Sequence, residues 1–147
     1  MSTLGGIHHL GLTVTDVERS ASWYEDVLGF RQVGQLGSRD DERRKIFLRH
    51  EGLSIRLGLV EHHTSTRAAF DETVPGLDHL AFTVASRSEL EQWLVHLSNH
   101  RIHHSLITDA RSIPGALVLV FRDPDNIQLE LFVEPPAAPP ASALTSS

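Results

Sequence analysis

The chain has 147 residues, of which 40% are hydrophobic and 22% are charged, and this suits one ordinary domain or two small units. It has no cysteine, which excludes disulfides, thiol nucleophiles and thiolate metal sites. The formal net charge of −6 predicts no nucleic-acid partner, and no apolar run approaches the roughly 18 residues that span a membrane. The N-terminus does not resemble a signal peptide, so we expect a cytoplasmic protein.

The first half of the chain predicts a strand, a helix and three further strands. Residues 9–14 alternate between apolar and other side chains, which is typical of a half-buried strand. Asp16 is a suitable N-cap for a helix that continues to Leu28, and Gly29 is a suitable residue to end it. The three strands are predicted over residues 30–36, 45–49 and 53–60.

The second half predicts the same succession of elements after a polar linker, residues 61–76. A strand over residues 79–84 precedes a helix that either Ser86 or Ser88 caps. Residues 135–147 are rich in Pro, Ala and Ser, and we expect this tail to be disordered. The last three strands are predicted over residues 103–107, 116–122 and 127–133.

Self-similarity indicates that the two halves are copies of one unit. His9–Val14 (HLGLTV) recurs as His79–Val84 (HLAFTV), and residues 55–59 match residues 127–131. The predicted fold class is therefore α+β, with two tandem βαβββ modules that form a curled mixed sheet around a metal cleft. The modules are predicted over residues 5–60 and 77–134.

Strand parity selects three candidate metal ligands. If the apolar residues of the first and last strands pack on the helices, His9, His79 and Glu130 lie on the opposite faces. Two imidazoles and one carboxylate form a facial triad with open positions, which suits Fe(II) best; Mn(II), Co(II), Zn(II) or Ni(II) are possible. A histidine on a strand is more often a hydrogen-bonded polar residue, and the duplication is what favours the ligand interpretation.

The same parity predicts the surroundings of the metal. We expect Arg56 to contact a substrate anion, with a cross-strand surface pair as an equal alternative. His50 is a candidate acid or base, although an exposed turn histidine is the more common case. Glu130, Arg56 and His50 are thus the predicted catalytic residues. The predicted substrate-binding residues are Arg56, Gln128, Leu48, Val118, Val120, Phe132 and Arg122, with Ile46 as a further apolar neighbour.

These motifs resemble those of the vicinal oxygen chelate superfamily, which includes glyoxalase I, bleomycin-binding proteins, fosfomycin-resistance transferases and extradiol dioxygenases. The matching stretches cover both modules: His9–Asp16, Trp23–Phe30, His79–Val84 and Phe121–Leu131. The resemblance implies the fold of that superfamily, and its three ligand positions fall on His9, His79 and Glu130.

Departures from the family patterns bear on the activity. Gly58 stands where glyoxalase I and the epimerases have a fourth ligand, which leaves three protein ligands, as in extradiol dioxygenases and fosfomycin transferases. Val120 stands where extradiol enzymes have a tyrosine. Gly11 stands where fosfomycin transferases have a threonine, and residues 109–115 lack the lysine of their potassium loop.

The resemblance implies a metalloenzyme whose small-molecule substrate chelates the ion through vicinal oxygens, with Fe(II) dioxygenase-type chemistry as the leading hypothesis. The alternatives are a redox-neutral glyoxalase-like lyase or isomerase, a thiol transferase, and a metal-free protein that sequesters a drug or metabolite. We expect a homodimer, because open sheet edges favour pairing, and the modules pair either within one chain or across two. No membrane partner is expected.

Overall fold

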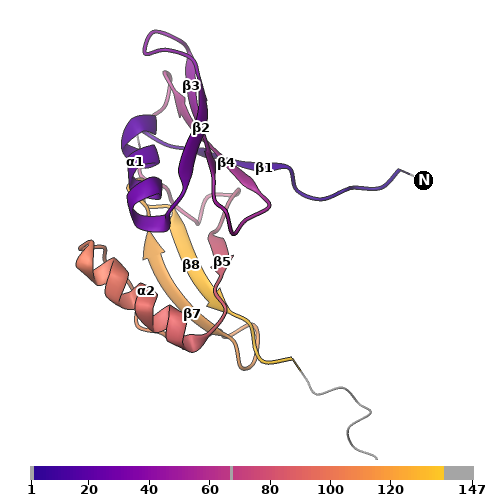
Figure 1. The fold of residues 1–147 in the computed structure, drawn as a ribbon. Helices are drawn as coiled ribbons and strands as arrows, with labels where there is room; N and C mark the ends of the chain where they lie inside the picture. The colour runs from indigo at the N-terminus through magenta and orange to yellow at the C-terminus, as the bar shows by residue number, and fades with distance from the viewer. Residues whose placement is uncertain (1, 67, 138–147) are drawn as a thin grey trace, which may run out of the picture. The chain divides into compact units, whose positions relative to one another are not determined.

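The computed structural model describes residues 2–66 and 68–137 and contains two four-stranded sheets, each with one helix (Figure 1). The α+β fold with two tandem βαβββ modules is confirmed, although the two sheets are separate and neither is closed. The first module consists of β1 (His9–Thr13), α1 (Val17–Leu28), β2 (Arg31–Leu36), β3 (Arg43–Arg49) and β4 (Arg56–His62). The second consists of β5 (Leu80–Thr83), α2 (Arg87–Asn99), β6 (Thr108–Asp109), β7 (Leu117–Arg122) and β8 (Gln128–Val133).

The chain divides into two compact units, and one turn of the second module belongs to the first unit. The first unit holds Met1–Gly76 together with Arg122–Ile127, and the second holds Leu77–Phe121 and Gln128–Ser147. The turn between β7 and β8 therefore belongs to the first unit, although both strands belong to the second.

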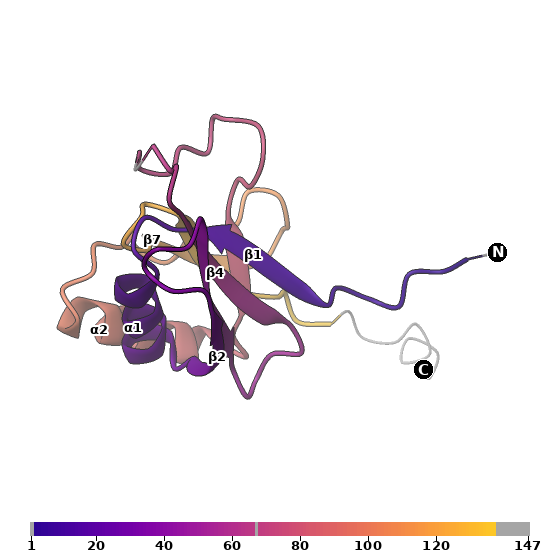
Figure 2. The same cartoon turned by 90° about the horizontal axis from the view of Figure 1, so that it is seen from above.

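In the first unit the strand order is β1-β4-β3-β2, with β1 parallel to β4 and β3 antiparallel to both of its neighbours. Helix α1 lies along one face of this sheet (Figure 2). The strand residues on that face are apolar and buried, and they form the core of the unit: Leu12, Val14, Ile46, Leu48, Leu57 and Leu59.

Helix α1 begins and ends where its sequence predicts. The Asp16 side chain accepts hydrogen bonds from the backbone N–H groups of Glu18 and Arg19, which have no partner within the helix. Gly29 ends the helix with φ 73°, a left-handed conformation that glycine adopts without steric cost. Between these caps, Val17, Ala21, Tyr24, Val27 and Leu28 lie on one stripe of the helix and are buried against the sheet.

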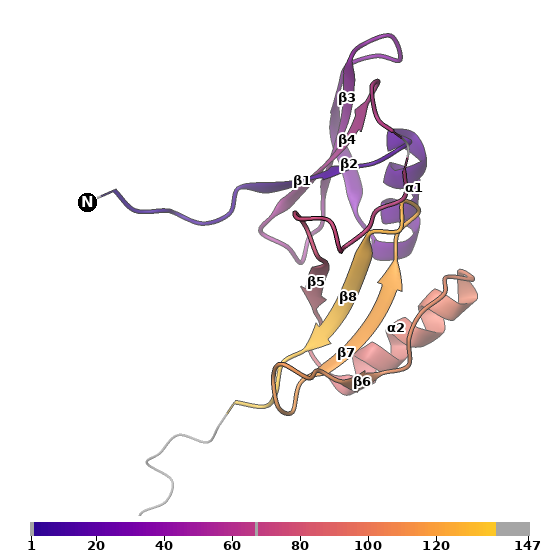
Figure 3. The same ribbon diagram turned by 180° about the vertical axis from the view of Figure 1, so that it is seen from behind.

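In the second unit the strand order is β5-β8-β7-β6, and β5 is parallel to β8 (Figure 3). Ser86 is the N-cap of α2 and accepts a hydrogen bond from the Glu89 N–H. Leu90 and Leu97, two turns apart on α2, are fully buried. They lie against a sheet face that β8 supplies with Leu129 and other buried side chains.

Several element boundaries differ from the predictions, most clearly those of β4 and of the strand predicted over residues 103–107. Strand β4 begins at Arg56 rather than at residue 53 and continues to His62, so the predicted linker 61–76 starts inside a strand. The strand predicted over residues 103–107 is reduced to one isolated bridge, between His104 and Phe121. The reason lies at Ser105, whose hydroxyl takes the hydrogen bond of the Val120 N–H and so replaces a backbone partner. Residues 138–147 of the predicted disordered tail lie outside the described residues.

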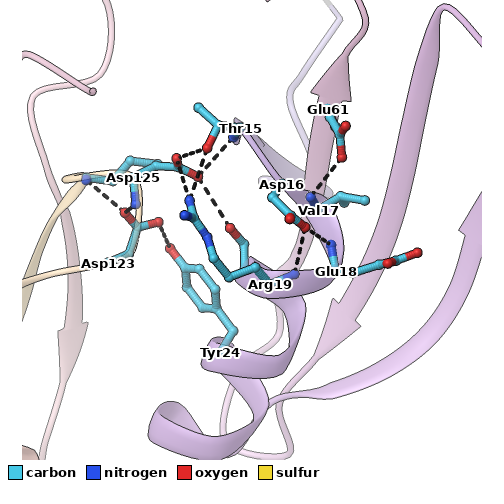
Figure 4. A network of polar contacts seen from close by, with 11 residues as sticks. Thr15, Asp16, Val17, Glu18, Arg19, Tyr24, Glu61, Asp123 and Asp125 are labelled. Carbon is cyan, nitrogen blue, oxygen red and sulfur yellow. Dashed lines mark hydrogen bonds and ion pairs between the residues drawn. The ribbon is translucent and has the colours of Figure 1, made fainter. Parts of the chain in front are cut away.

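Two buried carboxylates fix the β7–β8 turn within the first unit (Figure 4). Asp125 accepts hydrogen bonds from the Thr15 N–H and hydroxyl, from the Arg19 guanidinium and from the Ser20 hydroxyl. Asp123 accepts one from the Tyr24 hydroxyl at 3.1 Å. Burial raises the pKa of Asp123. Burial, followed by the charge of Asp123, raises the pKa of Tyr24 well above its usual value.

Among the described residues, no helix is both long and apolar enough to cross a lipid bilayer.

We predict that D125A lowers the free energy of unfolding by about 3 kcal/mol, because the change leaves several buried donors and one guanidinium without their acceptor. Urea unfolding followed by circular dichroism measures this loss. The matched control is D26A, which removes an exposed aspartate from α1 and is expected to change stability by less than about 0.5 kcal/mol. Equal losses in the two variants would contradict the role of the Asp125 network.

Candidate functional site

Two of the three predicted metal ligands lie together in the second unit. His79 immediately precedes β5, and Glu130 lies in the middle of β8. The parallel register pairs Leu80 with Leu129 and Ala81 with Glu130, so His79, Ala81 and Glu130 share the face opposite to the buried leucines. The His79 Nε2 atom is 3.7 Å from the Glu130 Oε2 atom.

Neighbouring polar groups orient both side chains. The His79 Nδ1 atom lies 2.6 Å from the Asp78 Oδ1 atom. A proton on Nδ1 is thereby held by a carboxylate, which leaves the Nε2 lone pair directed toward Glu130. The Gln128 amide donates a hydrogen bond of 3.2 Å to the other oxygen of Glu130. Asp78 was missed in the sequence, although an acidic residue next to a candidate ligand is a signal that could have selected it.

The pair fits part of a metal site. Two ligand atoms bound to one ion at about 2.1 Å are roughly 3 to 3.5 Å apart, so the 3.7 Å separation of the His79 and Glu130 atoms requires only a small rotation. Within residues 2–66 and 68–137, no group of three His, Asp or Glu side chains lies close enough together to hold an ion. His79 and Glu130 alone could therefore supply only two ligands to an ion, and metal binding by this pair stays a prediction.

The third predicted ligand, His9, belongs to the first unit. It lies exposed at the start of β1, and its Nδ1 atom is 2.8 Å from the Nδ1 atom of His8. Its parity is as predicted, because Leu12 and Val14 of the same strand are buried while His9 and Thr13 are exposed. Metal binding by His9 stays a prediction.

The predicted apolar lining of the second unit has the expected parity. On β7, Leu119 and Phe121 are buried, while Val118 and Val120 between them are only partly buried. Phe132, two residues after Glu130 on β8, is likewise partly buried on the Glu130 face. These three side chains give the open face of this sheet apolar surface, as small-molecule sites have.

The predicted lining of the first unit is wrong at Leu48 and Ile46. Leu48 is fully buried, and it pairs with Leu57 on the face that α1 covers. Ile46 pairs with Leu59 on the same face. The intervening Phe47 occupies the open face instead, opposite Gly58. Residues 46–48 are all apolar and show no alternation, so their pattern does not distinguish between the two parities.

The remaining predicted residues have identifiable neighbours. Arg56 is exposed on β4 and lies next to His9 in the parallel register. His50 lies in the turn after β3, where its ring contacts Phe30 and its Nδ1 atom accepts a hydrogen bond from the Gly52 N–H. These contacts position the turn, and an acid–base role for His50 stays a prediction.

Arg122 has a carboxylate partner. Its guanidinium binds both oxygens of Glu72, at 3.0 and 2.6 Å, and donates a further hydrogen bond to the Asn126 carbonyl. A substrate anion that used Arg122, as predicted, would therefore have to displace Glu72.

Comparisons with known proteins give consistent matches over most of the chain. A model of the Glyoxalase/Bleomycin resistance protein/Dioxygenase superfamily matches residues 6–131. Uncharacterized protein YwkD of Bacillus subtilis (strain 168) is 30% identical over 130 residues, which are 88% of this chain and 97% of that protein. A glyoxylase/bleomycin resistance protein/dioxygenase domain from Frankia sp. EAN1pec is 32% identical, with a TM-score of 0.78 over 90% of this chain and 99% of that one.

A more distant solved structure shares the fold. The genomically encoded fosfomycin resistance protein FosX from Listeria monocytogenes, solved with Mn(II) and sulfate, is 16% identical. Its TM-score is 0.65 over 89% of this chain and 93% of that one.

The ion pair of Glu72 and Arg122 predicts a pH-dependent contribution to stability. Hydrogen bonds from Arg122 lower the pKa of Glu72 from 4.5 to about 2. Because the pKa is lower in the folded state, the contribution is present above about pH 4.5 and is lost as the pH falls toward 2. E72Q is therefore expected to be less stable than the wild type at pH 7, by a difference that narrows below pH 4.5.

Urea unfolding at pH 7, 5, 4 and 3 measures this difference. The matched control is E134Q, which changes an exposed glutamate just beyond β8. A deficit of E72Q that stayed constant from pH 7 to pH 3 would show that the charge of Glu72 does not contribute to folding.

Proposed function

We propose that this chain, which belongs to the Glyoxalase/Bleomycin resistance protein/Dioxygenase superfamily, is a metal-dependent enzyme for a small molecule that carries two neighbouring oxygens. The metal ligands in this proposal are His9, His79 and Glu130, and the preferred ion is Fe(II). One observation supports it above all: the His79 Nε2 and Glu130 Oε2 atoms lie 3.7 Å apart on the open face of the second sheet, with Asp78 on the opposite nitrogen.

Each residue around the His79–Glu130 pair has a defined task in this proposal. Asp78 holds the Nδ1 proton of His79 and so keeps Nε2 available as a ligand. Gln128 fixes one oxygen of Glu130 and leaves the other directed toward His79. Val118, Val120 and Phe132 exclude water around the pair. A bound Fe(II) ion would supply Lewis acidity toward the chelating oxygens and the capacity to activate O₂.

A dioxygenase-type reaction is the preferred chemistry, and a redox-neutral lyase, isomerase or thiol transferase is the alternative. Oxygen uptake in the presence of Fe(II) and catechol-like substrates distinguishes them, because only the first consumes O₂. A metal-free protein that sequesters a drug or metabolite is a third possibility. Tight binding of an aromatic or glycopeptide ligand by protein that binds no metal would support it.

The proposal takes the third ligand, His9, either from the same chain or from a second chain of a homodimer. Exposed edge strands favour pairing between copies, and β2, an edge of the first sheet, exposes Val33 and Leu36. Mixing H9A with E130A, two variants that each lack one proposed ligand, distinguishes the two cases.

We predict that the wild-type chain binds one divalent ion and that H79A and E130A each bind it at least about tenfold more weakly, because each loses one of three ligands. Anaerobic calorimetry with Fe(II), and with Mn(II) or Co(II) as stand-ins, measures the affinity, and elemental analysis measures the stoichiometry. E134A is the matched control for a lost surface carboxylate. Thermal melting without metal shows that the variants fold.

Metal binding of the wild type equal to that of E130A would overturn the proposal.

Mixing H9A with E130A chains, after unfolding and refolding together, recovers about a quarter to a half of the sites only if the ligands come from two chains, because mixed dimers then contain one intact site. No recovery places all three ligands in one chain.

We predict that D78N weakens metal binding by 10- to 100-fold while leaving one site per chain, because an amide no longer stabilises the required His79 tautomer. The same calorimetric titration measures this. The matched control is D71N, a change of another exposed aspartate. An unchanged affinity in D78N would mean that the Asp78–His79 contact plays no part in the site.

A further inference from the structure

The open face of the first sheet is basic, although the chain as a whole carries a formal charge of −6. Strand alternation and the cross-strand register assign the side chains of this face, because the alternate residues are the buried ones. Within the described strands of this sheet, no aspartate or glutamate lies on the face. Its cationic and imidazole residues are His9, Arg31, Arg43, Lys45, Arg49, Arg56 and His62.

Three of these arginines form a row across the end of the sheet. Arg31 of β2 is the register partner of Arg49 of β3. Leu48 of β3 pairs with Leu57 of β4, so Arg49 and Arg56, one residue further along each strand, are also opposite each other. Arg56 is in turn the partner of His9 on β1. We call Arg31, Arg49 and Arg56 the arginine row; adjacent members are one strand spacing apart, about 4.8 Å.

Among the residues that the structure describes, the arginine row has one weak carboxylate partner. Like charges directly opposite each other destabilise a sheet. The carboxylate nearest to the row is Glu51, 3.7 Å from Arg31, and both of these side chains are more than three-quarters exposed, so the pair is weak. In the described part of the chain, neither Arg49 nor Arg56 forms an ion pair. Three adjacent guanidiniums with one weak partner indicate a place for an external anion.

The surface beside the row is suited to the rest of a ligand. A hollow of about 400 Å³ lies against Arg31 and Arg49, and it is also lined by Val33, His50 and the exposed Glu51. Two residues along the strands from the row, the register brings together Gly11, Gly58, Phe47 and Gly34. A Cβ added at Gly11 would meet only a backbone oxygen at 4.0 Å. The floor between the row and the Phe47 ring is therefore low and carries no charge.

We infer that the arginine row binds a phosphate or phosphonate group of the substrate. A carboxylate is satisfied by one bidentate guanidinium, whereas a dianionic tetrahedral group offers three oxygens and twice the charge, which matches several adjacent guanidiniums. The exposed Glu51 gives way to such a group without breaking a buried contact. Only the identification of this anion as part of the substrate rests on the proposed function; the anion site itself stands on the geometry of the first unit.

The test is calorimetric titration of metal-free protein with inorganic phosphate and with methylphosphonate, at constant ionic strength. We expect saturable binding to the wild type, and binding at least about tenfold weaker in R49Q and in R56Q, since each loses charge-assisted hydrogen bonds. Acetate is expected to bind at least tenfold more weakly than phosphate. The matched control is R43Q, which removes an arginine of the same strand and face at the far end of β3 and is expected to change affinity less than twofold.

Two results would overturn the inference: no saturable phosphate binding by the wild type, or an equal loss in R43Q, which would indicate a diffuse effect of net charge. Metal affinity, measured separately on the same R49Q and R56Q proteins, keeps this test distinct from that of the proposed function. One ion per chain without phosphate binding overturns the anion site alone, whereas phosphate binding without metal binding overturns the metalloenzyme alone. Thermal melting of each variant shows that the loss is not one of folding.

Discussion

One constraint governs both modules: each sheet has a single helix, which covers one of its faces. The covered faces hold the buried leucines of the strands, among them Leu12 and Leu59 in the first unit and Leu129 and Leu131 in the second. Side chains of opposite parity are then free to carry chemistry. The His79–Glu130 pair and the arginine row both lie on faces that the helices leave uncovered.

The sequence predicted most of the fold because the signals were local and strong. The α1 caps, Asp16 and Gly29, and the repeated first strand needed no knowledge of tertiary contacts. Prediction failed where neighbouring signals were equivalent or where a side chain entered the ladder. Residues 46–48 are all apolar, so only pairing with Leu57 and Leu59 reveals which of them is inside. The Ser105 hydroxyl interrupts a predicted strand by replacing a backbone group.

The candidate site was predictable to the extent that parity decides it. Alternation placed His79 and Glu130 on one face, and the 3.7 Å contact between them follows from the parallel pairing of β5 with β8. Strand alternation assigns each side chain to a face of its own sheet. It does not predict which faces of the folded chain meet, so it could not predict whether His9 lies near His79 and Glu130. Because Ile46 and Leu48 of β3 were assigned to the open face, Phe47 and Arg49, which share that face with Arg56, were not predicted there.

The exchange of the β7–β8 turn has a consequence for the order of folding. Tyr24 and Thr15 lie near the start of the chain, but their carboxylate partners are 99 and 110 residues further on. A nascent first module that closed on its own would bury the Tyr24 hydroxyl with no acceptor. The first unit therefore completes these polar contacts only after the β7–β8 turn has been synthesised, and contacts between residues so far apart in sequence are of the kind that slows folding.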